Sequence, residues 1–117
     1  MVRLTLQEKR DEATDKYHAL IEIMESLRRN LDQAYALVDL VANDVKTLRE
    51  DLESAKDSDE KTFLEKELQK DIVKLKEARS RSGQVRRQLR QAKERVDEQI
   101  DTVNRLEIEL IKKPSMG

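Results

Sequence analysis

The chain has 117 residues, of which 42% are charged and 3% aromatic, with a formal net charge of −1 and neither Cys nor Trp. Too few large side chains are present to fill a globular core, and the lack of Cys excludes a disulfide framework or a thiol nucleophile. Ala, Glu, Lys, Leu and Arg supply about half of the residues, which is typical of coiled coils. We therefore expect an all-α protein.

The first predicted helix covers residues 3–55. Its apolar residues alternate three and four positions apart, which is the a and d spacing of a heptad repeat. The register continues without a break as far as Ala55. The larger side chains of this predicted seam are Leu20, Met24, Leu27, Leu31, Val38, Val41, Leu48 and Leu52.

A turn is predicted at residues 56–60, because the heptad phase slips by two positions there. Coiled coils absorb insertions of three or four residues by local over- or unwinding, and a slip of two fits neither. Asp57 or Ser58 can cap a following helix, and the acidic residues after them suit the positive end of a helix dipole. The absence of Gly counts against a tight turn.

The second predicted helix covers residues 60–113 and ends before Pro114, leaving a tail of residues 114–117. This abrupt finish suggests a segment of a longer chain. The larger seam residues of the second helix are Leu64, Leu68, Leu75, Val85, Leu89, Val96, Val103, Leu106 and Leu110.

The two arms are nearly equal in length, which favours a long helical hairpin, an antiparallel coiled coil in which every a position meets a d position. The alternative is a long parallel coiled-coil dimer with a central kink. That dimer would place Asp71 against its own copy in the seam, a costly arrangement of like charges. A break at Gly83 would give a three-helix arrangement instead.

The apolar surface of both helices is wider than a two-stranded seam needs. Additional apolar side chains stand at e and g positions, as in bundles of three or four helices. We therefore expect two hairpins to associate as a homodimer that forms a four-helix bundle, although a different helical partner could use the same residues. The predicted oligomer interface is Ile21, Ile23, Tyr35, Leu37, Ile72 and Ile100.

A basic run at residues 74–95 holds nine Lys and Arg residues against Glu77 and Glu94. The simplest interpretation is a solvated face answered by acidic residues of the first helix. The alternative is a regulatory adaptor whose basic stripe binds an acidic protein, nucleic acid or an anionic membrane. Against nucleic acid, the run has no aromatic residue for base stacking. The candidate acidic-ligand stripe is Arg79, Arg81, Arg86, Arg87, Arg90, Lys93 and Arg95.

The sequence predicts no enzyme, metal site or cofactor. His18 is the only His and has no Cys or nucleophile to act with, and no Gly-rich phosphate loop is present. The longest apolar stretch is far shorter than the roughly 20 residues of a membrane span, and the start lacks the apolar run of a secretory signal. We expect a cytoplasmic oligomerisation or spacer module of a larger scaffold, cytoskeletal, motor-stalk or tethering protein.

Overall fold

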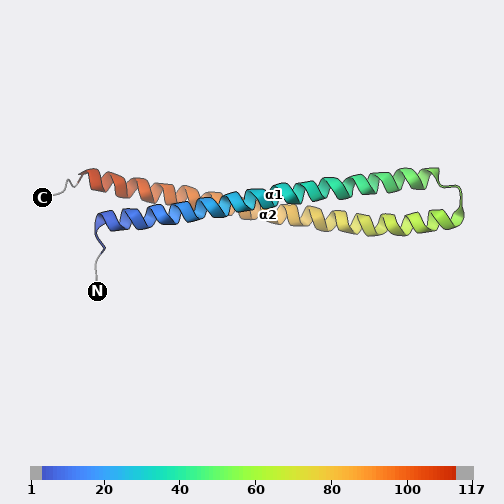
Figure 1. Ribbon diagram of the computed structural model, residues 1–117, viewed down its shortest axis with the longest axis horizontal. Helices are drawn as coiled ribbons and strands as arrows, with labels where there is room; N and C mark the ends of the chain where they lie inside the picture. Colours follow the sequence, from blue (N-terminus) through green and yellow to red (C-terminus); the bar gives the residue numbers. More distant parts are fainter. Residues whose placement is uncertain (1–3, 113–117) are drawn as a thin grey trace. The chain divides into compact units, whose positions relative to one another are not determined.

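The protein is an all-α helical hairpin, seen in a computed structural model that describes residues 4–112 (Figure 1). Helix α1 spans Leu6–Ser54 and helix α2 spans Ser58–Lys112, joined by residues 55–57. The predicted helix ranges of 3–55 and 60–113 differ from these by a few residues, and the predicted end at Pro114 lies outside the described residues. The parallel dimer with a central kink is wrong, because the chain turns back after Ser54.

The described chain divides into two compact units. Unit 1 contains residues 4–28, with the first part of α1, and residues 88–112 of α2, and unit 2 contains Arg29–Arg87, including the turn. In each unit an α1 segment is paired with an α2 segment that runs in the opposite direction (Figure 1).

Helix α1 begins with a cap that the heptad analysis did not identify. The Glu8 backbone N–H donates a hydrogen bond to the Thr5 Oγ1 atom at 3.1 Å, and the Thr5 hydroxyl donates to Glu8 Oε1 at 3.0 Å. The spacing Thr-x-x-Glu is the sequence signature of a capping box. It satisfies one of the backbone donors left free at a helix start.

The turn is closed by Asp57, one of the two predicted cap residues. The Asp57 carboxylate accepts a hydrogen bond from the Asp59 N–H at 3.2 Å. The backbone carbonyl of Asp57 accepts a second one from the Lys61 N–H at 3.0 Å. The Ala55 N–H donates to the Leu52 carbonyl at 3.3 Å, which tightens the end of α1. No described non-Gly residue has a positive φ angle, so the turn needs no glycine.

The predicted seam is the buried part of unit 2. All seam positions from Leu31 to Val85 are buried or half-buried except Lys61, which is exposed beside the turn. The most buried members are mainly small side chains, because two helices alone cannot enclose a large one. They are Ala34, Val41, Val45, Ala55, Leu64, Ala78 and Ser82.

In unit 1 the same register buries Ala13, Ala92 and Val96. A polar residue joins the two helices there, since the Gln99 side-chain amide donates a hydrogen bond to the Ala13 carbonyl at 2.9 Å. A polar group at one seam position favours a single register of the two helices.

Helix α2 runs unbroken through Gly83, so the three-helix arrangement is wrong. The neighbouring Ser82 is buried, and its hydroxyl donates to the Arg79 carbonyl at 2.9 Å. This bond satisfies the hydroxyl inside its own helix.

Candidate interaction site

The residues of the predicted oligomer interface differ in exposure. Ile23, Tyr35 and Leu37 have 52%, 41% and 42% of their surface exposed, whereas Ile21, Ile72 and Ile100 are half-buried. No described large side chain is fully buried. The hairpin therefore leaves part of its apolar surface in contact with water.

These six residues lie on two flanks of the seam and do not form the single surface that was predicted. In an antiparallel pair, e positions of one helix face e positions of the other across one edge of the seam, and g positions face g positions across the opposite edge. The e flank carries Tyr35 and Ile72 in unit 2, and Ile21 and Ile100 in unit 1. The g flank carries Leu37 in unit 2 and Ile23 in unit 1.

Leu40, which the sequence analysis did not single out, extends the g flank of unit 2. Its side chain is 60% exposed, and it follows Leu37 by three residues, so the two lie one above the other on α1. Asn30 and Gln33 continue the same stripe without a charge. An uncharged stripe in a chain this rich in charge was the pattern that could have revealed it.

The candidate acidic-ligand stripe is exposed at all seven positions, with Arg79–Arg87 in unit 2 and Arg90–Arg95 in unit 1. Residues 4–112 contain three ion pairs, each within one helix, and none includes a member of the stripe. Lys74, at the start of the basic run, pairs with Asp71 of its own helix at 3.8 Å. Among the described residues, the cations of the stripe therefore form no ion pair with acidic residues of α1.

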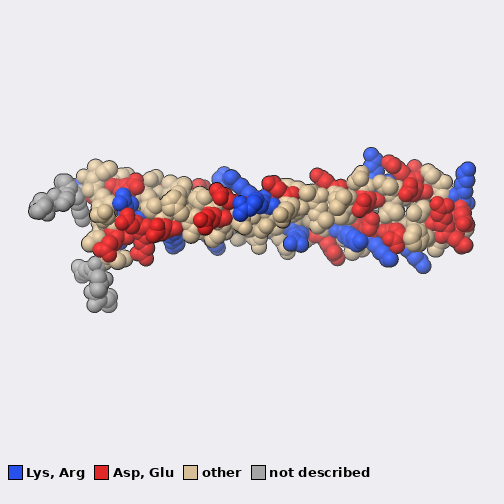
Figure 2. Space-filling view, viewed as in Figure 1, with Lys and Arg blue, Asp and Glu red and all other residues tan. Residues whose placement is uncertain are grey.

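Charge is unevenly distributed over unit 2. Figure 2 shows acidic side chains gathered over its turn, with Lys and Arg side chains exposed among and beyond them. Asp57 and the first-turn residues Asp59 and Glu60 contribute to this acidic end. Their negatively charged carboxylates lie near the positive end of the α2 dipole and stabilise the start of this helix. These residues therefore have a structural role.

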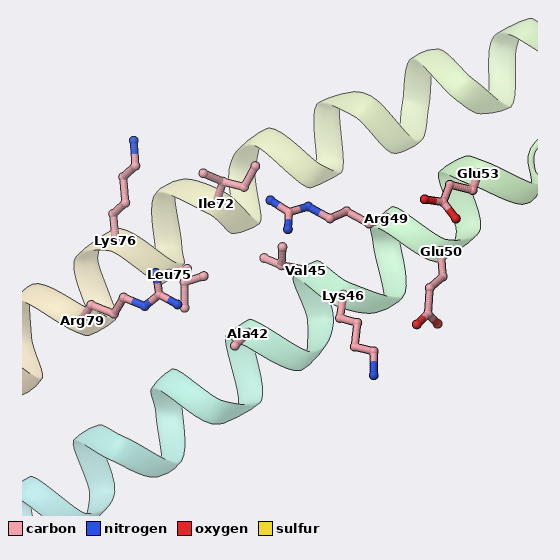
Figure 3. Close-up of a pocket in the computed structure, with 10 residues that line it drawn as sticks. All are labelled: Ala42, Val45, Lys46, Arg49, Glu50, Glu53, Ile72, Leu75, Lys76 and Arg79. Atoms are coloured by element: carbon pink, nitrogen blue, oxygen red, sulfur yellow. The ribbon is translucent and has the colours of Figure 1, made fainter.

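A cleft of about 390 Å³ opens between α1 and α2 in unit 2. Figure 3 shows its apolar part, formed by Ala42, Val45, Ile72 and Leu75. The charged residues that line it are Lys46, Arg49, Glu50, Glu53, Lys76 and Arg79. Arg49 and Arg79 extend along the cleft toward each other, whereas Lys46 and Lys76 point away from it (Figure 3). The heptad pattern places Arg79 in the basic stripe and does not indicate its relation to Arg49.

The titratable residues of the described chain do not gather into a metal-binding cluster. His18 is exposed and its ring lies 5.5 Å from that of its neighbour Tyr17. No group of His, Cys, Asp and Glu within residues 4–112 has the arrangement of a metal site. Neither α1 nor α2 contains a segment apolar enough, over the required length, to cross a bilayer.

Comparisons with protein-family models, with curated proteins and with solved structures found no match to this chain.

Proposed function

We propose that the chain is a structural oligomerisation or spacer module that holds a larger protein together by helix–helix self-association. Two hairpins would combine into a four-helix bundle, as a homodimer with twofold symmetry. The parent protein would be a cytoplasmic scaffold, cytoskeletal, motor-stalk or tethering component, in which this segment would have no catalytic role.

The observation that carries this proposal is the exposed g flank of unit 2. Leu37 and Leu40 are 42% and 60% exposed next to a seam in which most of the leucines are only half-buried. Burying a fully exposed leucine is worth about 1.5–3 kcal/mol. A second hairpin laid on this flank would bury both leucines and cover the neighbouring seam.

Sedimentation equilibrium of the whole chain tests the proposal. We expect about twice the monomer mass of 13.7 kDa, and the same mass when salt is raised from about 0.1 M to about 1 M, because apolar contacts are not screened. The double variant Leu37→Glu/Leu40→Glu should be a monomer with unchanged helix content. The matched control is Val73→Glu, a residue of unit 2 with similar exposure at an f position, opposite the seam. A monomeric wild-type chain, or equal effects of both variants, would contradict the proposal.

A second candidate function is a regulatory adaptor that binds an acidic ligand. It is favoured by the exposed stripe, none of whose cations belongs to an ion pair of the described residues. Reversing Arg86, Arg87 and Arg90 to Glu should abolish binding of an acidic protein or polyanion and leave the mass in solution unchanged. Ligand binding of this kind weakens steeply as salt rises, which distinguishes it from self-association.

A further inference from the structure

We propose that the cleft of unit 2 docks an acidic amphipathic helix of a partner protein, held by Arg49 and Arg79 over an apolar floor. This site lies on the e flank, across the seam from the g flank that carries the proposed self-association. The two proposals therefore stand or fall separately.

The floor of the cleft has room for an aliphatic side chain. Ala42 and Ile72 occupy e positions that face each other across the seam, and the small Ala42 side chain leaves space beside the larger Ile72. Val45 and Leu75 lie below them in the seam. Grooves of this kind between helices accept the apolar face of an amphipathic helix.

The direction of the helices makes the two arginines converge. A helical side chain leans toward the N-terminus of its own helix. Because α1 and α2 are antiparallel, Arg49 leans away from the turn and Arg79 leans toward it, so both extend over the floor (Figure 3). Tyr35 is the e residue opposite Arg79, so the two arginine Cα atoms are about four helical turns apart, roughly 21 Å along the axis.

The charges around the floor favour an acidic ligand. Neither Arg49 nor Arg79 belongs to an ion pair among residues 4–112. Of the charged residues that line the cleft, Lys46, Lys76 and Glu50 point away from it, which leaves two arginines against the single carboxylate of Glu53 (Figure 3). Guanidinium groups bind carboxylates through two parallel hydrogen bonds, so each arginine can fix one acidic side chain.

The spacing of the arginines defines the sequence of the ligand. Because both side chains lean inward, their guanidinium groups lie closer together than the Cα atoms, and we assign them a spacing of about two turns of a helix. A partner helix would therefore carry acidic residues at positions i and i+7 and aliphatic residues at i+3 and i+4, all on one face. A phosphate backbone would match the arginines but would leave the apolar floor empty, which is why we infer a protein partner.

The test uses the whole chain and a fluorescein-labelled helical peptide of about 15 residues, since shorter helices are marginal in water. The peptide has Glu at i and i+7, Leu at i+3 and i+4, and Ala or Gln elsewhere. Fluorescence anisotropy should show binding that weakens about tenfold or more in the double variant Arg49→Gln/Arg79→Gln. The matched control, Lys46→Gln/Lys76→Gln, removes the same charge from the same two helices at side chains that point away from the cleft, and should change the Kd by about twofold or less. A peptide with Gln in place of both Glu residues, and one with Ser in place of both Leu residues, should each lose about tenfold or more.

Several results would overturn the proposal. Equal weakening by both double variants would mean that the peptide responds to overall positive charge, and no binding at all would exclude the site. A lower mass of Arg49→Gln/Arg79→Gln in sedimentation equilibrium would assign the cleft to a second copy of the chain. Circular dichroism and melting temperature of each variant establish that the hairpin is retained, and a charge-neutral floor variant, Ile72→Ser, provides a second measure of the site through loss of peptide binding.

Discussion

Replacing Gly83 with Ala should increase the free energy of unfolding by about 1 kcal/mol, the difference between these residues inside a helix. Helix α2 continues through Gly83, and no described glycine has a positive φ angle. Apart from its chain neighbours and the backbone of its own helix, a Cβ atom added there would have one described heavy atom within 4 Å, the Arg87 Nη1 at 3.7 Å, which is an ordinary van der Waals contact. Neither backbone strain nor crowding therefore offsets the gain.

The measurement is thermal unfolding followed by circular dichroism. A gain of about 1 kcal/mol corresponds to a rise in Tm of roughly 4 °C for a chain of about 100 residues. The control is Ser80→Gly, which introduces a glycine at an exposed position three residues earlier in α2 and should lower Tm by about half as much. The two changes test the same backbone term with opposite signs.

An unchanged or lower Tm for Gly83→Ala would refute this reasoning if Ser80→Gly behaves as expected. The glycine would then be required for a bend or a close contact that α2 adopts in solution. Gly83 is half-buried at a b position outside the seam, and the Arg87 side chain is the one described contact of an added Cβ atom beyond its own helix backbone. A contact that requires glycine would therefore have to come from outside the hairpin.

Two further predictions concern the seam and the turn. Gln99→Ala should lower the unfolding free energy by about 1 kcal/mol through loss of the bond to the Ala13 carbonyl. Gln99→Leu should raise the unfolding free energy by about 1 kcal/mol, because burial of the leucine side chain more than offsets the lost hydrogen bond. The Ala13 carbonyl keeps its backbone hydrogen bond within α1. Equal losses for both in urea unfolding would show that the amide does more than fill the seam. Asp57→Ala should cost about 1 kcal/mol through loss of the α2 cap, whereas Ser58→Ala, whose hydroxyl caps nothing in the described chain, should stay within about 0.5 kcal/mol. Indistinguishable urea midpoints for these two variants would contradict the assignment of the cap.

Much of the fold could be predicted because the heptad repeat directly records which side of each helix is buried. The phase slip after Ala55 located the turn, and the two registers identified the buried positions on both sides of it. The turn itself was less accessible to sequence reasoning. Its closure depends on backbone bonds to Asp57 and Leu52, and a three-residue connection without Gly has no strong sequence pattern.

The candidate site was predicted less completely, for a physical reason. Heptad positions indicate that Tyr35 and Leu37 border the seam, but each lies beside a different edge, so the exposed apolar residues do not add up to one surface. Position alone also treats Arg49 and Arg79 as ordinary flanking charges. Their relation depends on side-chain direction, and neither arginine belongs to an ion pair within residues 4–112.

Chain direction is what links the fold to this cleft. In a parallel pair, side chains at flanking positions of both helices lean toward the same end, so two arginines would follow one another along the groove. The antiparallel hairpin makes Arg49 and Arg79 lean toward a common centre, where Ala42 leaves the floor open beside Ile72. A short, defined span with a cation at each end and apolar atoms between them selects a ligand by spacing as well as by charge. The turn closed by Asp57 thus determines more than the pairing of two helices, because it sets the direction from which each arginine approaches the cleft.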